Sequence, residues 1–290
     1  MSYDALSFLI VPFIACLILV GIHAYLGIHV LARGVIFVDI ALAQIAALGT
    51  TTAMLMGHEP DTTTAYLYSL GFTFIGAALF ALSRDIRERV PQEAIIGITY
   101  AVSSALAILL VDNVPHGIEH IKSILIGNIL WVTPRHVGFV ALLYGTIGLI
   151  HYLLRKRFLD MSFNHDSPLN RGRQAMFWDL IFYMTFGFVI TSSVQMAGVL
   201  LVFSFLIVPA VISAMFSRNV LSRLLIGWST GFIVCVVGIW GSYSLDLPTG
   251  AAVVATFGIA VLLSIAARVV MNRMSENLQE ARDREGEPAP

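Results

Sequence analysis

Long apolar stretches separated by short polar segments make up almost the whole chain. Nine of them approach or reach the length that an α-helix needs to cross the ~30 Å hydrocarbon core of a bilayer. Their residues do not alternate between apolar and polar, as the strands of a membrane barrel would. The pattern predicts nine transmembrane helices, at approximately residues 6–25, 35–56, 65–82, 94–111, 137–154, 180–193, 197–216, 224–243 and 250–270.

The composition supports a membrane protein. The 290 residues are 58% hydrophobic and 12% charged, with a mean hydropathy of +0.84, whereas charged residues make up about a quarter of a soluble domain. We predict an all-α polytopic membrane protein with one transmembrane domain over residues 1–271. Residues 272–290 form a charged tail that ends in prolines, and we expect this tail to be cytoplasmic, partly helical and partly disordered.

One apolar segment is too short to cross. Residues 121–132, IKSILIGNILWV, lie between Pro115 and Pro134. We interpret this segment as a half-helix or re-entrant piece, which membrane proteins tolerate only where protein or a water-filled cavity surrounds it. The predicted fold is therefore about nine spans plus a short half-helix.

Positive charges are distributed unevenly among the loops. Nine crossings place the two termini on opposite sides of the membrane. With the C-terminus inside, only Lys122 and Arg135 of the 17 lysines and arginines lie outside, a bias that the positive-inside rule strongly favours. We therefore predict a cytoplasmic C-terminus.

Asp39 and Gln44 stand out because they lie within an apolar span, GVIFVDIALAQIAALG, residues 34–49. A carboxylate inside a span costs about 2.5 to 3.5 kcal/mol at the helix centre, so it usually faces the bundle interior and marks a pathway. Two interpretations of Asp39 stay open: it lines a transport path, or it pairs with Arg33 or interfacial water near the end of its helix. Gln44 fits either the path or a hydrogen bond between helices.

A proline lies deep in the stretch MAGVLLVFSFLIVPAVISA, residues 196–214. Pro209 removes a backbone hydrogen bond and clashes with the preceding turn, so we expect the helix to kink or break there. We include Pro209 among the candidate residues of the path.

HGIEH, His116 to His120, matches the H-x-x-E-H pattern of one class of zinc proteases. Pro115 and Gly117 flank the motif within a short outer loop, and no third ligand is apparent. We interpret His116, Glu119 and His120, with Asp39, as candidates for transient metal contact. A merely solvated loop and, on this motif alone, a protease remain alternatives.

Four further histidines lie near the ends of predicted spans: His23, His29, His136 and His151. We expect them to be interfacial and hydrogen-bonded. No G-x-x-x-x-G-K-[ST] motif occurs, and the only lysines are Lys122 and Lys156. A phosphate-binding P-loop is thus excluded, and we predict that the chain is not an enzyme and that any ATP hydrolysis takes place in a partner.

Five strings occur in order along the chain: LGIHVLARGVIFVDIALAQIAALG (26–49), EAIIGITYAVSSALAILL (93–110), ILIGNILWVT (124–133), MAGVLLVFSFLIVPA (196–210) and DLPTGAAVV (246–254). Together they resemble the membrane permease subunits of bacterial ABC importers for zinc, manganese and iron. The resemblance extends over approximately residues 6–270. It implies the ABC importer permease fold, which is related to that of vitamin B12 and siderophore permeases.

The resemblance also implies partners and a location. They are a homodimer around a central path in the lipid of the bacterial inner membrane, two cytosolic ABC ATPase subunits, and an extracytoplasmic metal-binding protein. No nucleic acid and no permanently bound cofactor are expected. The cargo is a divalent transition metal, for which we favour zinc over manganese and iron.

The cytoplasmic loop FNHDSPLNRG, residues 163–172, resembles the coupling helix that docks into the ATPase in this family. Phe163 begins the loop, and Asp166 and Gly172 fall where the family has an acid and a glycine. Asn164 and Pro168 replace the usual Asp and Ala, so the details of docking differ from the family pattern.

The largest departure from the family lies in the span of Asp39. Gln44 stands where the family has a histidine, and Asp39 comes one position before the family's aspartate. Residues four apart are turned by about 400° and share a helix face, whereas residues five apart are turned by about 500° and diverge by about 140°. Asp39 and Gln44 therefore cannot grip one ion together in a regular helix. We hypothesise that Asp39 supplies negative potential along the path without holding the ion for long.

Two other transport functions remain as alternatives. A permease for a chelated metal such as a siderophore would share a similar fold and need a wider cavity, so cargo size separates the two. A secondary transporter driven by an ion gradient would be expected to carry more intramembrane carboxylates than the one at Asp39.

Overall fold

The computed structural model describes residues 3–86, 89–112, 125, 127, 129–164, 167, 169 and 172–285, and all the regular elements in these ranges are helical. In chain order they are α1 (Tyr3–Arg33), α2 (Val38–Leu55), α3 (Thr63–Leu82), η1 (Ser83–Ile86), α4 (Gln92–Val111), η2 (Ile129–Trp131), α6 (Pro134–Leu153), α7 (Arg155–Phe163), α8 (Gly172–Ala197), α9 (Val199–Phe216), α10 (Val220–Leu245) and α11 (Thr249–Glu285). The predicted all-α fold is confirmed.

Within the described residues, nine helices are long and apolar enough to cross a membrane, judged by length and composition. Each predicted span coincides with one of them, so the predicted number is confirmed. One clear difference is at α8, which begins at Gly172 although we predicted a span from residue 180. The polar residues before Leu180 suggested a loop. One of them, Asp179, is in fact buried and paired inside the bundle.

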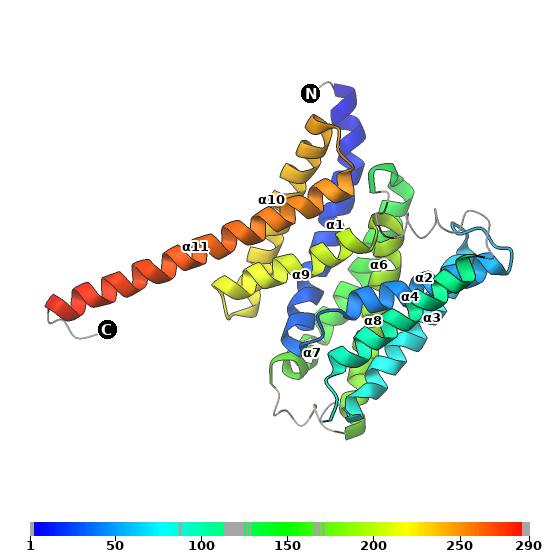
Figure 1. Cartoon of the computed structure of the whole chain (residues 1–290), viewed down its shortest axis with the longest axis horizontal. Helices are drawn as coiled ribbons and strands as arrows, with labels where there is room; N and C mark the ends of the chain where they lie inside the picture. Colours follow the sequence, from blue (N-terminus) through cyan, green and yellow to red (C-terminus); the bar gives the residue numbers. More distant parts are fainter. Residues whose placement is uncertain are drawn as a thin grey trace.

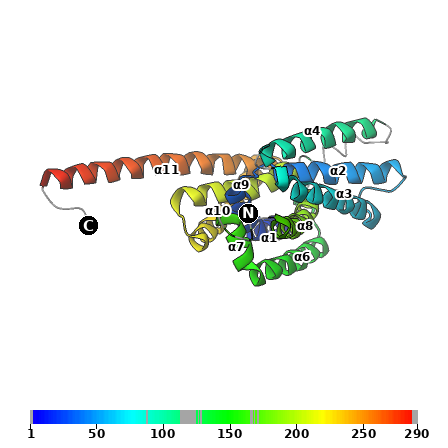
Figure 2. The same cartoon turned by 90° about the horizontal axis from the view of Figure 1, so that it is seen from below.

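The helices form two groups that meet at α8. In the first group α2, α3 and α4 lie side by side, with α2 in contact with both neighbours (Figures 1 and 2). In the second group α1 packs against α9 and α10 and also contacts α6 and the short α7. Helix α8 packs against α3 and α2 of the first group and against α9 and α6 of the second. The two groups thus share a core that surrounds α8.

Helix α11 runs away from this body (Figure 1). Its first half packs on α9 and α10, whereas every side chain from Ile265 to Asn277 is exposed. The helix continues to Glu285, so the part of the predicted tail that the structure describes is helical. The division into a membrane domain and a cytoplasmic tail stays a prediction.

Small residues let the central helices approach closely. A Cβ atom added at Gly27 of α1 would lie 1.9 Å from the backbone oxygen of Leu206 on α9. Membrane helices associate by close packing and not by a hydrophobic driving force, so such glycines are common at their contacts. By contrast, a Cβ atom at Gly21, on the same helix, would meet nothing within 4 Å.

We expected the helix to kink or break at Pro209, and the structure shows that it does not break there. Helix α9 runs unbroken through Pro209, while Gly198, with a φ of 78°, separates α8 from α9. Gly127 packs against this break, because a Cβ there would lie 2.1 Å from the backbone of Ala197. Of the predicted half-helix the structure describes only Leu125, Gly127 and residues 129–132, which include the short helix η2; the rest lies outside the described residues.

We predict that Gly27→Ala lowers the stability of the protein by about 1 to 3 kcal/mol or more, because the new methyl group overlaps the rigid backbone of α9. The measurement is the melting temperature of the purified chain in detergent micelles. Gly21→Ala is the matched control on the same helix. It should melt within about a degree or two of the wild type, because substitutions that meet no neighbouring atom have small effects on stability. Equal melting of the two variants would contradict the close α1–α9 contact.

Candidate functional site

Asp39 and Gln44 point from different sides of α2. Asp39 lies in the first turn and is 2% exposed, whereas Gln44 is half-buried, on a face with the partly exposed Ile40 and the exposed Phe37. These three positions recur at the spacing of one helix face. The predicted divergence of Asp39 and Gln44 is thus what the regular α2 shows, and Ile40 occupies the place four residues before Gln44.

The beginning of α2 is capped by a residue from another helix. Phe37, at the N-cap position, has no side chain that can accept a hydrogen bond, and Glu93 of α4 accepts one from its backbone amide at 3.1 Å. Helix N-termini leave several amides without partners, so a carboxylate there is favourable. Sequence reasoning missed Glu93. The sequence feature that could have identified Glu93 is its position, as an acidic residue in the first turn of the apolar helix α4.

Arg33 pairs with Asp179 of α8, and none of the described ion pairs joins it to Asp39. Its guanidinium Nη1 binds Oδ1 of Asp179 at 2.6 Å, and Arg84 of η1 binds the other oxygen of Asp179. Arg33 also donates from Nε to Ser162 Oγ on α7 at 3.0 Å and lies over the ring of Phe182. We call Arg33, Arg84 and Asp179 the ion cluster. It ties α1, η1, α7 and α8 together.

Three histidines that we expected at the membrane interface are buried inside the bundle. His23 and His29 are 0% exposed and His151 is 1% exposed. His29 Nδ1 lies 2.8 Å from Ser162 Oγ, and His151 Nε2 lies 2.9 Å from Thr185 Oγ1. Each of the three makes a hydrogen bond, as we expected. Their place at the membrane interface stays a prediction.

His23 and His136 lie on the side of the bundle away from the ion cluster. His23 bonds to the Leu19 carbonyl and to Ser193 on α8. His136 is half-buried at the start of α6 and, with Asp61, lines a pocket of about 740 Å³ between α3, α6 and α8. This pocket is the larger of the two cavities described in this section.

Pro209 makes helix contacts. It is buried in α9, and Gly227 of α10 lies opposite its ring, where an added Cβ would be 3.5 Å from Pro209 Cβ. Its place in a transport path stays a prediction.

The predicted coupling loop begins where α7 ends. Phe163 is the last residue of α7, and Gly172, with a φ of 58°, begins α8; Asp166 lies outside the described residues. Asp160, which the sequence did not single out, orders the first part of the loop, since its carboxylate accepts hydrogen bonds from Asn164 Nδ2 at 3.0 Å and from Ser167 Oγ.

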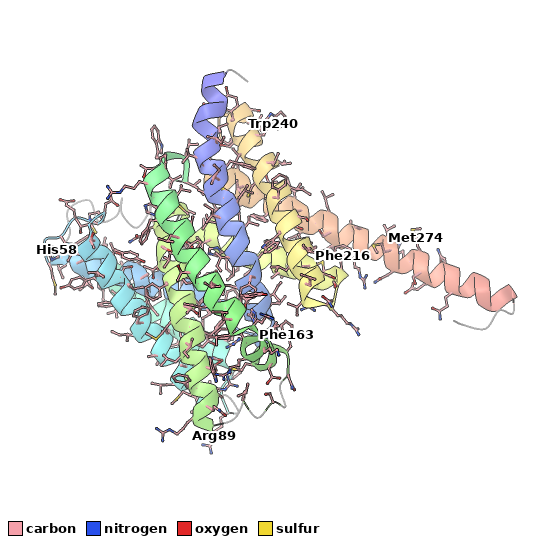
Figure 3. The ribbon with its side chains drawn as sticks, turned by 180° about the vertical axis from the view of Figure 1, so that it is seen from behind. His58, Arg89, Phe163, Phe216, Trp240 and Met274 are labelled. Atoms are coloured by element: carbon pink, nitrogen blue, oxygen red, sulfur yellow. The ribbon has the colours of Figure 1, made fainter. Side chains whose placement is uncertain are left out.

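A second cavity adjoins this loop. It measures about 320 Å³ and is lined by residues of α1, α7, α9 and α10, among them Phe163 and Arg223. Phe163 and Arg89 lie towards one end of the bundle, and Trp240 lies at the opposite end (Figure 3). The cavity thus lies next to the point where the loop begins, at the end of the bundle where Arg89 lies.

His116, Glu119 and His120 lie outside the described residues, so the structure tests neither the metal patch nor the protease motif. Among the residues that are described, no group of three or more His, Cys, Asp or Glu side chains is placed to hold a metal ion. Tight chelation by such a group is therefore not a feature of this part of the chain.

Comparison with known proteins identifies the family. Residues 5–268 match the ABC 3 transport family. The chain belongs to this family. The predicted resemblance is thereby confirmed.

Two relatives and one solved structure show how far the similarity extends. The manganese transport system membrane protein MntB of Synechocystis is 28% identical over 237 residues, 78% of this chain and 75% of MntB. The manganese import system permease protein ScaB of Streptococcus parasanguinis is 25% identical over 212 residues, 71% of this chain and 75% of ScaB. A chain of PsaBC from Streptococcus pneumoniae, in complex with Fab, superposes with a TM-score of 0.73 at 21% identity and covers 90% of this chain and 93% of that one. The predicted permease fold is confirmed.

We predict that Asp179→Asn destabilises the protein by about 3 to 5 kcal/mol, because it leaves Arg33 and Arg84 facing a neutral group in a buried site. Thermal unfolding in detergent micelles measures the effect. Glu276→Gln, on the exposed part of α11, removes a carboxylate that makes no described contact and serves as the control. A melting temperature of Asp179→Asn equal to that of the control would show that the ion cluster contributes little.

Proposed function

We propose that the chain is the membrane-embedded permease subunit of an ATP-driven importer for a divalent transition metal. The observation that carries this proposal is the match of residues 5–268 to a transport family, together with relatives named for manganese transport. The chain contains no nucleotide-binding motif, so ATP hydrolysis belongs to a separate subunit. Its own task is to provide a path that opens and closes by rigid-body movement.

For the metal, the chemistry of α2 favours manganese over the zinc expected from the resemblance. Gln44 offers a neutral amide where the family has an imidazole, and Asp39 offers a carboxylate. Oxygen donors suit manganese, whereas imidazole suits zinc and iron. The names of MntB and ScaB point in the same direction. Zinc remains a cargo to be tested by competition.

For the ATPase, we propose that the loop from Phe163 to Gly172 and the adjoining 320 Å³ groove form the docking surface. Asp160 orders the loop, and Ser162 at the end of α7 bonds to Arg33 of the ion cluster. A displacement of the start of this loop would therefore be transmitted directly to α1 and, through the ion cluster, to α8.

The remaining partners and the orientation follow the same proposal. The cytoplasm lies on the side of the ion cluster and of the C-terminus, as the distribution of arginines favours. A metal-binding protein delivers cargo at the opposite face, where the 740 Å³ pocket with Asp61 and His136 opens. Two copies of the chain form the path in the bacterial inner membrane.

The test uses vesicles that contain the chain together with its ATPase. We expect ATP-dependent uptake of radioactive Mn²⁺ when the metal-binding protein is supplied, with Zn²⁺ as competitor. Uptake of a metal chelate but not of the free ion would replace the proposal by a siderophore-type permease. Uptake by the chain alone, driven by an ion gradient, would replace it by a secondary transporter.

We predict that Asp39→Asn lowers the rate of uptake at least about tenfold, the low end of what lost metal-site interactions cost, while the ATPase still assembles. The reason is the loss of negative charge beside the path. Asp246→Asn is the control, because Asp246 is exposed in a left-handed conformation that asparagine also tolerates. Uptake by Asp39→Asn at the wild-type rate would contradict a role for Asp39 in transport.

A further inference from the structure

The carboxylates of Asp39 and Glu93 both lie at the first turn of α2. Helices α2 and α4 pack against each other and both begin near the end of the bundle that carries the ion cluster. Glu93 is the second residue of α4, and its Oε1 accepts a hydrogen bond from the amide of Phe37, two residues before Asp39. Side chains from two helices that are far apart in the sequence thus lie at the start of α2.

Helix capping accounts for only part of this arrangement. One oxygen of Glu93 caps α2, and an acid in the first turn, such as Asp39, is favourable at the positive end of a helix. The other oxygens remain: Asp39 Oδ1 and Glu93 Oε2 are both buried and accept no hydrogen bond from any described residue. A buried polar atom without a partner lowers stability, and more so when it is charged. Arg33, which could have paired with Asp39, binds Asp179.

We propose that Asp39 and Glu93 form a transit site for a divalent cation at the inner end of α2, and this assignment rests on the function proposed above. The two free oxygens supply hard donors, and their two negative charges balance those of the ion. Carboxylates combined with retained water are the usual environment of such cations in sites that they leave readily.

The site is built to be weak. The chain offers two oxygens, far fewer than the roughly six to eight donors of a tight Ca²⁺ site. The positive end of the α2 dipole lies at the same place and weakly opposes the binding of a cation. A divalent metal would therefore dwell briefly here before it enters the cytoplasm, and Gln44, on the other face of α2, would not hold it at the same time.

Substitutions at Glu93 separate the cap from the ligand. Glu93→Gln keeps a side-chain oxygen that can accept from Phe37 and removes only the charge. Glu93→Ala removes both. A residue that acts only as a cap would tolerate Glu93→Gln and lose stability in Glu93→Ala. A residue that also binds the cation would lose metal affinity in both.

The experiment measures binding of Mn²⁺ alone to the purified full-length chain in detergent micelles, from the loss of the electron paramagnetic resonance signal of free Mn²⁺. We expect Asp39→Asn and Glu93→Gln each to weaken binding at least about tenfold. The Mn²⁺ affinity of the double variant should be close to that of the single variant with the lower affinity, because either change breaks the same site. Asp246→Asn is the matched control and should bind as the wild type does. Without metal, Glu93→Gln should melt close to the wild type.

Wild-type Mn²⁺ affinity in Glu93→Gln would overturn the proposal and leave Glu93 as a helix cap. If Glu93→Gln does not fold, Asp39→Asn decides, since wild-type affinity there overturns the pair as well. The vesicle assay keeps the two proposals apart. Absence of ATP-dependent uptake by the wild type overturns the proposed function, whereas normal uptake and binding in both single variants overturn only this site.

Discussion

The structure depends on how a charge is paired in the buried interior of the bundle. Asp179 lies within α8 and would be costly alone, but Arg33 and Arg84 bind its two oxygens from α1 and η1. Such a cluster is not a large source of stability, because desolvation of the charges consumes most of the Coulombic gain. Its effect is positional: three separate segments meet at one carboxylate, and loss of Asp179 removes the group that holds α1 and η1 to α8. The end of the bundle that carries the ion cluster is thus held in one arrangement.

The two regions of functional interest are both attached to this cluster. Ser162, at the end of α7, bonds to Arg33 and to His29, so the loop beyond Phe163 starts from a fixed point. On the other side of Arg33 the chain turns at Gly34, whose φ of 68° favours glycine, and enters α2 within a few residues. The loop proposed to receive the ATPase and the carboxylates proposed to pass the metal are therefore connected through Arg33, which bonds to Ser162 and lies a few residues before α2.

Hydropathy was sufficient to predict the nine spans, because an apolar helix in lipid must satisfy its own backbone and has few alternatives. It was insufficient wherever distant residues meet. The start of α8 was predicted too late in the sequence, because a charged residue such as Asp179 is typical of a loop. Its ion pairs with Arg33 and Arg84, which allow it inside the bundle, are seen only in the structure. The helix is interrupted at Gly198 and continues through Pro209. A residue with a positive φ ends a helix, whereas a proline can be accommodated within a membrane helix. The buried His29 and His151 needed Ser162 and Thr185, far away in sequence.

The angular argument about α2 shows where local reasoning is dependable and where it ends. Helix geometry alone predicts that Asp39 and Gln44 diverge, and the structure has them on different faces. The same geometry cannot say what Asp39 faces instead, because that depends on α4, which returns to α2 only after the chain has crossed the bundle in α3. The one-residue shift of the aspartate then has a physical consequence. The carboxylate lies off the face of Ile40 and Gln44 and in the first turn of α2, next to the backbone amide that Glu93 caps. In the transit site that we propose, the α2 dipole would limit how tightly a cation is held.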